Sequence, residues 1–302
     1  MRWERAARGG PPSRFWSWRG RAFRSRSAEG SYSTCSLVVP CIHMGQGSYV
    51  GPPEPGDEAQ ARRGMYSDDT NAALALASSL VASGGLDGRH AARQYAEFFF
   101  DEAVMRRVRD GVDYKTAGLP PHFPFRDGSY ANGGGMRASP LGIAFRDASA
   151  AQVRAAAAEA VRSSHAHPEA VDGAAVQAYA VALAARLGAA GRARDFCPAA
   201  FLREAGAAAS TPAFQRRLDA VHRRFTALRG SAEADDVQVL RWIVDRCDPQ
   251  DRREGSGLGF QLAAVDMAPC VLWIAARYHR VPEEAIMRAI SISGSAKGGS
   301  PL

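Results

Sequence analysis

The spacing of the apolar residues from about residue 64 onward is the feature that most constrains the fold of this chain. Ala73, Leu76, Ala77 and Leu80 recur every three or four positions, which is the spacing of one helix face. The glycines at 84 and 85 are expected to end that helix. No segment shows a convincing alternation of apolar and polar residues, so strands are not predicted. The sequence therefore predicts an all-α fold, a compact bundle of many helices.

The same spacing continues along most of the chain. Further helices are predicted at residues 88–109, 136–146, 150–163, 168–187, 198–207, 211–228, 233–246, 261–279 and 282–292. Residues 111–135 are expected to form a long loop, and loops of this length in compact chains are usually functional or disordered.

The predicted 168–187 helix carries signals of a helix N-terminus. Pro168 suits the first turn, where a missing N–H costs little. Glu169 and Asp172 follow it, and acidic side chains complement the positive end of a helix.

The charge of the chain is concentrated at one end. The formal net charge is +7, and residues 1–27 hold eight arginines and one acid, Glu4, which gives 8 − 1 = +7. The remaining residues are therefore formally neutral and offer no basic surface for a polyanion. No apolar run approaches the roughly 20 residues that span a bilayer. We expect no direct nucleic-acid binding, no membrane insertion and a monomer.

The first 27 residues are rich in Arg and Ser and resemble an organellar transit peptide. A disordered tail, or translated upstream sequence without a role, is an equally good interpretation. The first interpretation places the protein in a mitochondrion or chloroplast, and the nucleus and cytoplasm remain alternatives. The five cysteines are scattered, odd in number and form no CxxC, which indicates a reducing compartment and neither a disulfide framework nor a zinc site.

Two adjacent acids, Asp68 and Asp69, stand at the start of the first helical pattern, between Ser67 and Thr70. Helix capping explains one of them, because Ser or Asp before a helix is a common N-cap. Two neighbouring carboxylates repel each other unless donors or a cation neutralise them, and Mg²⁺ prefers such oxygen ligands. Capping is favoured from the pattern alone, and a metal site would need further oxygen ligands.

The segment "GSYANGGGMR", residues 128–137, combines three consecutive glycines with a predicted helix start. Glycine lets the backbone approach a ligand closely, and N–H groups at a helix start suit a phosphate. The segment is neither a Walker A loop nor a dinucleotide fingerprint. An ordinary loop is the better interpretation of this pattern by itself.

Two further segments carry weaker signals. His165 and His167 precede the 168–187 helix, and a hydrogen-bonding role is favoured because no zinc partners are evident. The segment "GSGLGFQLAAVDMAPCVLW" leads through Leu262 into a helix, and is either a turn between helices or a wall against a flat ligand.

The order of these motifs along the chain resembles the ADP-ribosylglycohydrolase family. "YSDDT", "GSYANGGGMR", "SHAHPEAVDGAA", "GFQLAAVDMAP" and "AISISG" follow one another over about residues 64–294. Within this family, the chain most resembles the branch that removes ADP-ribose from serine and degrades poly(ADP-ribose). The resemblance implies a role in the DNA damage response. The resemblance implies an all-helical hydrolase with two Mg²⁺ ions, acting on ADP-ribose or ADP-ribosylated protein.

The resemblance also implies particular residues. Metal ligands would be Ser67, Asp68 and Asp69. The residues that would contact ADP-ribose are Phe125, Gly128, Ser129, Tyr130, Asn132, Gly133, Gly134, His165 and Leu262. Ala131 stands where the family has a glycine and is expected to stiffen the loop. No catalytic acid or base is assigned, because neither Glu54 nor Glu58 aligns with the catalytic Glu of the family.

A second departure concerns the metal site. The family ends its site with Gly-Gly-Asp-Thr-Asp-Thr, whereas this chain reads "ISISGSAKGGSPL". We expect residues 1–63 to be a largely disordered leader, residues 64–294 a C-terminally truncated family domain, and residues 295–302 an atypical tail. At most one weakly held Mg²⁺ is expected, with impaired hydrolysis. The alternative is an inactive ADP-ribose-binding or structural protein that reuses the fold.

Overall fold

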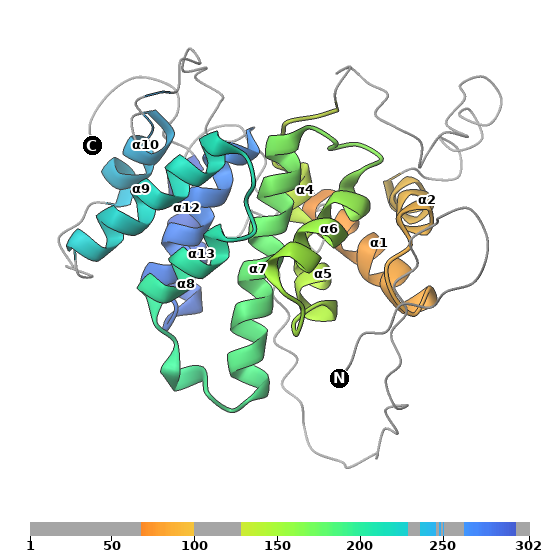
Figure 1. The fold of residues 1–302 in the computed structure, drawn as a ribbon, viewed down its shortest axis with the longest axis horizontal. Helices are drawn as coiled ribbons and strands as arrows, with labels where there is room; N and C mark the ends of the chain where they lie inside the picture. The colour runs from red at the N-terminus through yellow and green to blue at the C-terminus, as the bar shows by residue number, and fades with distance from the viewer. Residues whose placement is uncertain are drawn as a thin grey trace, which may run out of the picture.

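The computed structural model describes residues 68–99, 128–228, 236–245, 248, 250 and 263–293 of the 302-residue chain (Figure 1). These residues form no strand, and the extended backbone among them pairs in one isolated bridge, between Ala131 and Ala263. The prediction of an all-α fold is confirmed. None of the helices in this part of the chain is long and apolar enough to cross a bilayer.

The helices follow one another with short connections wherever both ends are described. In chain order they are α1 (Asp68–Ala82), α2 (Gly88–Phe99), α4 (Gly133–Met136), α5 (Ser139–Ala144), α6 (Ala150–Val161), α7 (Pro168–Ala189), the 3-10 turn η3 (Ala193–Asp195), α8 (Pro198–Gly206), α9 (Pro212–Leu228), α10 (Asp236–Asp245), α12 (Ala264–Arg277) and α13 (Pro282–Ser293).

Local sequence signals account for many helix ends. Ser149 and Gln152 form a reciprocal capping box at the start of α6. Helices α7, α8, α9 and α13 each begin with a proline, whose fixed φ suits the first helical position. Gly84, just after α1, has a φ of +60°, a conformation that side chains with a Cβ rarely adopt.

The predicted boundaries around residues 133–146 are wrong. Residues 133–135 were expected in a loop and residues 136–146 in one helix, but the glycines form α4 and a separate α5 follows it. Tertiary packing overrides the poor helix propensity of glycine here. A Cβ added to Gly134 would lie 3.3 Å from the Ala174 Cβ, and one added to Gly135 would lie 2.7 Å from Oε1 of Gln177. Gly134 and Gly135 therefore let α4 lie directly on α7.

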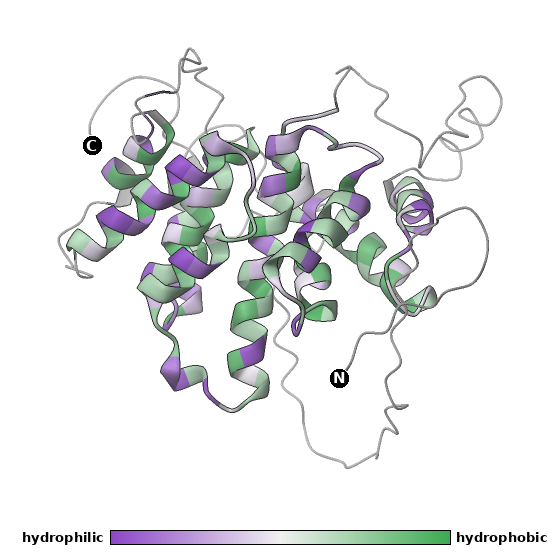
Figure 2. Ribbon diagram, in the orientation of Figure 1, coloured by the Kyte–Doolittle hydropathy of each residue, from purple (hydrophilic) through white to green (hydrophobic). Residues whose placement is uncertain are grey.

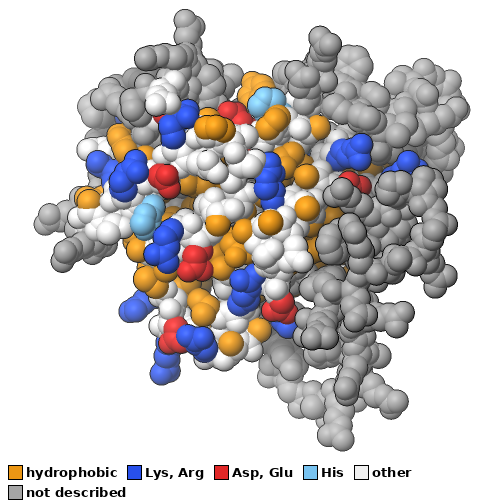
Figure 3. Space-filling view, in the orientation of Figure 1, with side chains coloured by type: hydrophobic (Ala, Val, Ile, Leu, Met, Phe, Trp, Pro, Cys, Tyr) orange, Lys and Arg blue, Asp and Glu red, His pale blue; other side chains and the backbone are white. Residues whose placement is uncertain are grey.

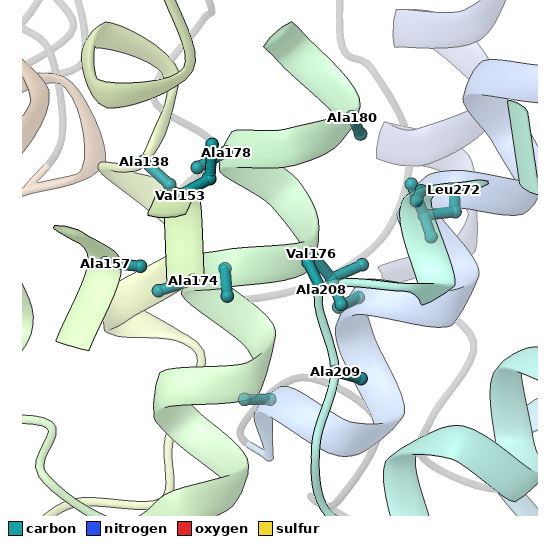
Figure 4. Close-up of a cluster of buried hydrophobic side chains, with 14 of the residues drawn as sticks. Ala138, Val153, Ala157, Ala174, Val176, Ala178, Ala180, Ala208, Ala209 and Leu272 are labelled. Atoms are coloured by element: carbon teal, nitrogen blue, oxygen red, sulfur yellow. The ribbon is translucent and has the colours of Figure 1, made fainter. Parts of the chain in front are cut away.

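Helix α7 is the centre of the bundle. It contacts α4, α5 and α6 on one side and α8 and α12 on the other, and Figure 1 shows it between these two groups of helices. Its neighbours approach closely because small residues line the contacts: a Cβ on Gly173 would lie 2.8 Å from the Ala264 Cβ of α12. Figure 4 shows that alanines make up much of this core, with larger side chains such as Val153, Val176 and Leu272 between them.

Helix α9 shows how an outer helix packs on this centre. Figure 2 shows hydrophilic and hydrophobic residues mixed along it, as expected for a helix with one buried face. Phe214, Leu218 and Val221 are buried on that face. Arg217 is also buried and pairs with Asp266 of α12 at 3.0 Å, so an ion pair and apolar contact hold α9 to α12.

Asp172 does more than complement the positive end of α7. Its side chain is fully buried and accepts hydrogen bonds from the backbone N–H groups of Ser210 (3.0 Å) and Thr211 (2.7 Å). Its second oxygen pairs with Arg154 of α6 at 3.2 Å. The carboxylate therefore joins α6, α7 and the segment that leads into α9.

Candidate functional site

The glycine-rich segment from residue 128 is held between two parts of the chain that are distant in sequence. Gly128 has a φ of +85° and lies so close to Ala166 that a Cβ would be 2.7 Å from the Ala166 nitrogen. The backbone N–H of Ser129 donates to the Ser164 carbonyl (3.0 Å), and the Tyr130 carbonyl accepts from Ala264 N–H (3.1 Å). The loop therefore joins the segment before α7 to the start of α12.

The middle of this loop has a defined internal structure. The Ser129 hydroxyl accepts a hydrogen bond from the Ala131 N–H (3.1 Å). Ala131 itself is in the bridge with Ala263, an extended arrangement that an alanine adopts readily. The Asn132 carbonyl accepts from Gly135 N–H (2.8 Å) and Met136 N–H (3.1 Å) and so begins α4.

His165 lies directly against this loop. A Cβ added to Gly133 would lie 2.5 Å from His165 Nε2 and 2.7 Å from Cε1, so the outer edge of the imidazole occupies the space of a missing side chain. Only glycine at position 133 leaves this space. The structure thus brings together His165 and Gly133, two residues that the sequence predicted for one site.

The neighbour of His165 that the sequence analysis missed is Arg137. This arginine is 4% exposed, and its guanidinium lies 4.2 Å from the centroid of the Tyr95 ring. Its Nη2 donates to the Ser164 hydroxyl (2.6 Å) and lies 3.2 Å from His165 Nδ1. Arg137 forms no ion pair with a carboxylate in the part of the chain that the structure describes. Its position at the end of "GSYANGGGMR" was a possible signal, but sequence alone does not show that an arginine is buried.

Burial and charge act on the ionisation of this group of residues. Burial, and to a smaller extent the adjacent Arg137 cation, together lower the pKa of His165 to about 3. Burial lowers the pKa of the Arg137 guanidinium and raises the pKa of the Tyr95 hydroxyl. His165 is therefore a neutral imidazole near pH 7.

His167 has a structural role, as its spacing indicated. Its Nδ1 accepts from the Glu169 N–H at 3.3 Å, which makes it the N-cap of α7. Its ring also meets the Tyr130 ring edge to face, with centroids 6.2 Å apart. The two neighbouring histidines therefore have different roles, one at the helix end and one at the glycine loop.

The acidic pair lies at the start of α1, a helix that contacts α4. Ser78 of α1 is hydrogen-bonded to Gln94 of the antiparallel α2 (3.0 Å), so earlier residues of α1 run alongside Tyr95 and the residues that follow it. Because α1 contacts α4 and Tyr95 of α2 contacts Arg137, the α1–α2 pair lies beside the helix that follows the glycine loop.

The described residues do not by themselves make a magnesium site. The side chain of Asp69 is exposed, Asp68 is described in its backbone alone, and Ser67 lies outside the described residues. No three His, Cys, Asp or Glu side chains cluster around a possible metal position in the described part of the chain.

Two residues that the resemblance implies as ADP-ribose contacts, Phe125 and Leu262, also lie outside the described residues. Leu262 directly precedes Ala263, which pairs with Ala131 of the loop. The backbone next to Leu262 is thus joined to the glycine loop.

The chain is similar to known proteins in sequence and in fold. The family model described as ADP-ribosylglycohydrolase matches residues 10–297. A solved structure described as an ADP-ribosylglycohydrolase-related protein complex is 23% identical and aligns with a TM-score of 0.49. The alignment covers 77% of this chain and 66% of the chain in that structure. No curated protein matches this chain.

Proposed function

Because this chain belongs to the ADP-ribosylglycohydrolase family, we propose that it binds ADP-ribose at the glycine loop and His165 and hydrolyses O-glycosidic ADP-ribose linkages. The substrate class is ADP-ribosyl-serine or poly(ADP-ribose). ADP-ribosylated protein is the partner, and no direct contact with nucleic acid or membrane is needed.

The close approach of His165 to Gly133 is the observation that best supports this proposal. A backbone without side chains can lie against the ribose and diphosphate, as glycine-rich loops do in other phosphate sites. The neutral imidazole beside it can donate one hydrogen bond to an oxygen of the ligand without binding a proton at pH 7. Gly128, Ser129, Tyr130, Asn132, Gly133, Gly134 and His165 are the described residues of the proposed site, and Phe125 and Leu262 complete it.

The reaction breaks the bond between ribose C1″ and the oxygen of the acceptor. Water adds its oxygen to C1″ and the acceptor oxygen takes up a proton, so the products are free ADP-ribose and the unmodified acceptor. A carboxylate is expected to act as the general acid or base. This chain's described residues bind and orient the ligand, and no acid or base is assigned among them.

Magnesium would be held by Ser67, Asp68 and Asp69, and Mg²⁺ favours such hydroxyl and carboxylate oxygens. A metal bound there would help to orient the ribose hydroxyls and to activate water. Residues 289–302 contain no acidic side chain, so they do not provide the second ligand set that the family resemblance implies. We propose that this polypeptide holds at most one Mg²⁺, weakly, and turns over slowly.

An ADP-ribose-binding protein with little hydrolysis is the second candidate. It is favoured by the same observation, that residues 289–302 contain no acidic side chain. It differs from the first candidate in turnover and not in binding.

One experiment separates these functions. The full 302-residue protein is titrated with ADP-ribose in a calorimeter, and release of ADP-ribose from a serine-modified peptide and from poly(ADP-ribose) is followed in excess Mg²⁺. Binding with Mg²⁺-dependent release supports the hydrolase. Binding without release supports the second candidate, and absence of binding contradicts both.

A pair of glycine variants tests whether the loop is the site. Gly133→Ala places a methyl group 2.5 Å from His165 Nε2, whereas Gly188→Ala in α7 meets no atom within 4 Å. We expect Gly133→Ala to lose ADP-ribose affinity by at least about tenfold, the size of one lost hydrogen bond. Gly188→Ala should bind as the unmodified protein does. Equal affinity of the two variants would exclude the Gly133 face as the binding site.

A further inference from the structure

We propose that Arg137 is a positioning residue that fixes His165 in the neutral tautomer with its proton on Nε2, so that an N–H donor faces the glycine loop. The placement of the proton follows from geometry alone. What the donor meets rests on the proposed function, in which an oxygen of ADP-ribose lies against the Gly133 backbone.

The first step of the argument is that arginine can only donate hydrogen bonds. Arg137 Nη2 carries two protons, and it lies 2.6 Å from the Ser164 hydroxyl oxygen and 3.2 Å from His165 Nδ1. Both neighbours therefore accept from it. Since a neutral imidazole carries one proton, acceptance at Nδ1 places that proton on Nε2.

The opposite tautomer is disfavoured by the same contacts. A proton on Nδ1 would point at the N–H groups of a buried cation. The Ser164 hydroxyl, 2.8 Å from Nδ1, could still accept that proton, but the repulsion from Arg137 would remain. With Nδ1 as acceptor, the Ser164 hydroxyl can share the single lone pair of that nitrogen with Arg137 Nη2, and neither contact is repulsive.

Arg137 is itself held in place. Its guanidinium lies over the Tyr95 ring at 4.2 Å, a favourable cation–π distance. The Tyr95 hydroxyl donates to the Ala160 carbonyl of α6 at 3.1 Å, which fixes that ring. The cation therefore has few other positions to adopt, and the imidazole next to it is oriented by a rigid partner.

The outer nitrogen of His165 is left for a ligand. Nδ1 faces Ser164 and Arg137, whereas Nε2 lies 2.5 Å from the position that a Cβ on Gly133 would take and has no hydrogen-bond partner among the described residues. A donor in this position recognises a hydroxyl or phosphate oxygen. It would not accept a hydrogen bond from a donor group.

The direct test is nitrogen-15 NMR of the full-length protein labelled at histidine, without ligand. Long-range correlations between ring nitrogens and carbon-bound protons distinguish a protonated Nε2 from a protonated Nδ1. We expect the His165 pattern of a protonated Nε2 at pH 7. A protonated Nδ1 would overturn the proposal whether or not the protein binds ADP-ribose.

Substitutions then test the part played by Arg137. In Arg137→Met we expect the His165 signal to move toward a mixture of tautomers and ADP-ribose affinity to fall by about tenfold. Arg137→Lys keeps a cationic donor and should retain the Nε2 tautomer and bind more tightly than Arg137→Met. Circular dichroism reports whether each variant folds.

Arg217→Met is the matched control, because Arg217 is also buried, at 2% exposed, and its loss also removes a cation. It should lower stability without changing the His165 tautomer. A tautomer that is unchanged in Arg137→Met, or changed equally in Arg217→Met, would show that Arg137 does not position His165. If neither the variants nor the unmodified protein bind ADP-ribose, the proposed function is contradicted, but the tautomer result is unaffected.

Discussion

His165 makes the free energy of unfolding depend on pH, because the pKa of its imidazole in the folded state is far below the value in the unfolded chain. Burial lowers that pKa to about 3, against about 6.5 in an unfolded chain. The charged group that acts on it is Arg137, which in turn faces Tyr95. Between these two pH values the unfolded chain binds a proton at this position and the folded chain does not.

This difference predicts that the protein loses stability as pH falls from about 6.5 toward 3. Stability rises with pH wherever the unfolded state binds more protons, so the contribution of His165 is fully present above about pH 6.5. At about 1.4 kcal/mol per pKa unit, the loss at pH 4 is up to about 3 kcal/mol. Urea unfolding at pH 7 and pH 4 measures it in the unmodified protein.

His165→Gln provides the comparison, since glutamine does not titrate. The other ionisable groups are present in both proteins, so the difference between their two pH profiles belongs to position 165. Parallel profiles would mean that His165 has an ordinary pKa.

For single residues, the sequence identified members of the proposed site better than it identified the contacts between them. His165 and Gly133 were identified from the order of motifs, and the structure places them in contact. His167 was expected to form hydrogen bonds, and it caps α7. Arg137 and Tyr95 were missed as a pair because 42 positions separate them, and their contact depends on how α2 packs against α1 and α6.

Among the helices, α7 shows how one buried acid can hold several elements together. Asp172 accepts two backbone hydrogen bonds from residues 210 and 211 and pairs with Arg154. Without its carboxylate, the two N–H groups and the guanidinium would lose their shared partner. Breaking such a buried pair on one side is costly because the remaining groups stay desolvated.

We therefore expect Asp172→Ala to lower the free energy of unfolding by about 3–5 kcal/mol. Glu169→Ala, one turn earlier in α7, is the matched control and should cost about 1 kcal/mol or less, as for an acid near a helix N-terminus. Urea denaturation of both variants measures the difference. Similar losses of stability in the two variants would mean that Asp172 only complements the positive end of α7, as its sequence position indicated.

The helix starts that could be predicted accurately are those marked by a proline. Proline at position 168, 198, 212 or 282 begins four of them, within one residue of the predicted start. The start of α4 could not be predicted because glycine disfavours a helix, and only contact with α7 explains it. Local chemistry sets most boundaries, and tertiary contact sets the boundary at the proposed site.

For the whole molecule, the position of the glycine loop between two groups of helices matters most. Helix α4 contacts α1 and α7, and also α12 from the second group. The bridge between Ala131 and Ala263 joins the loop to the start of α12. On the face shown in Figure 3, Lys and Arg side chains are dispersed among acidic and apolar ones. Because the loop and α4 contact both groups of helices, a ligand bound at the loop would act through contacts with both groups.

This arrangement predicts that ADP-ribose stabilises both groups together. A ligand that binds only the folded state adds about 2.7 kcal/mol at a concentration one hundred times its Kd. Hydrogen exchange followed by mass spectrometry should show slower exchange in residues 128–137 and in residues 263–277 at saturating ADP-ribose, together with a higher Tm. Gly188→Ala should respond in the same way and Gly133→Ala should not. Protection confined to residues 128–137 would show that the loop binds without involving α12, and the site would then belong to the first group of helices alone.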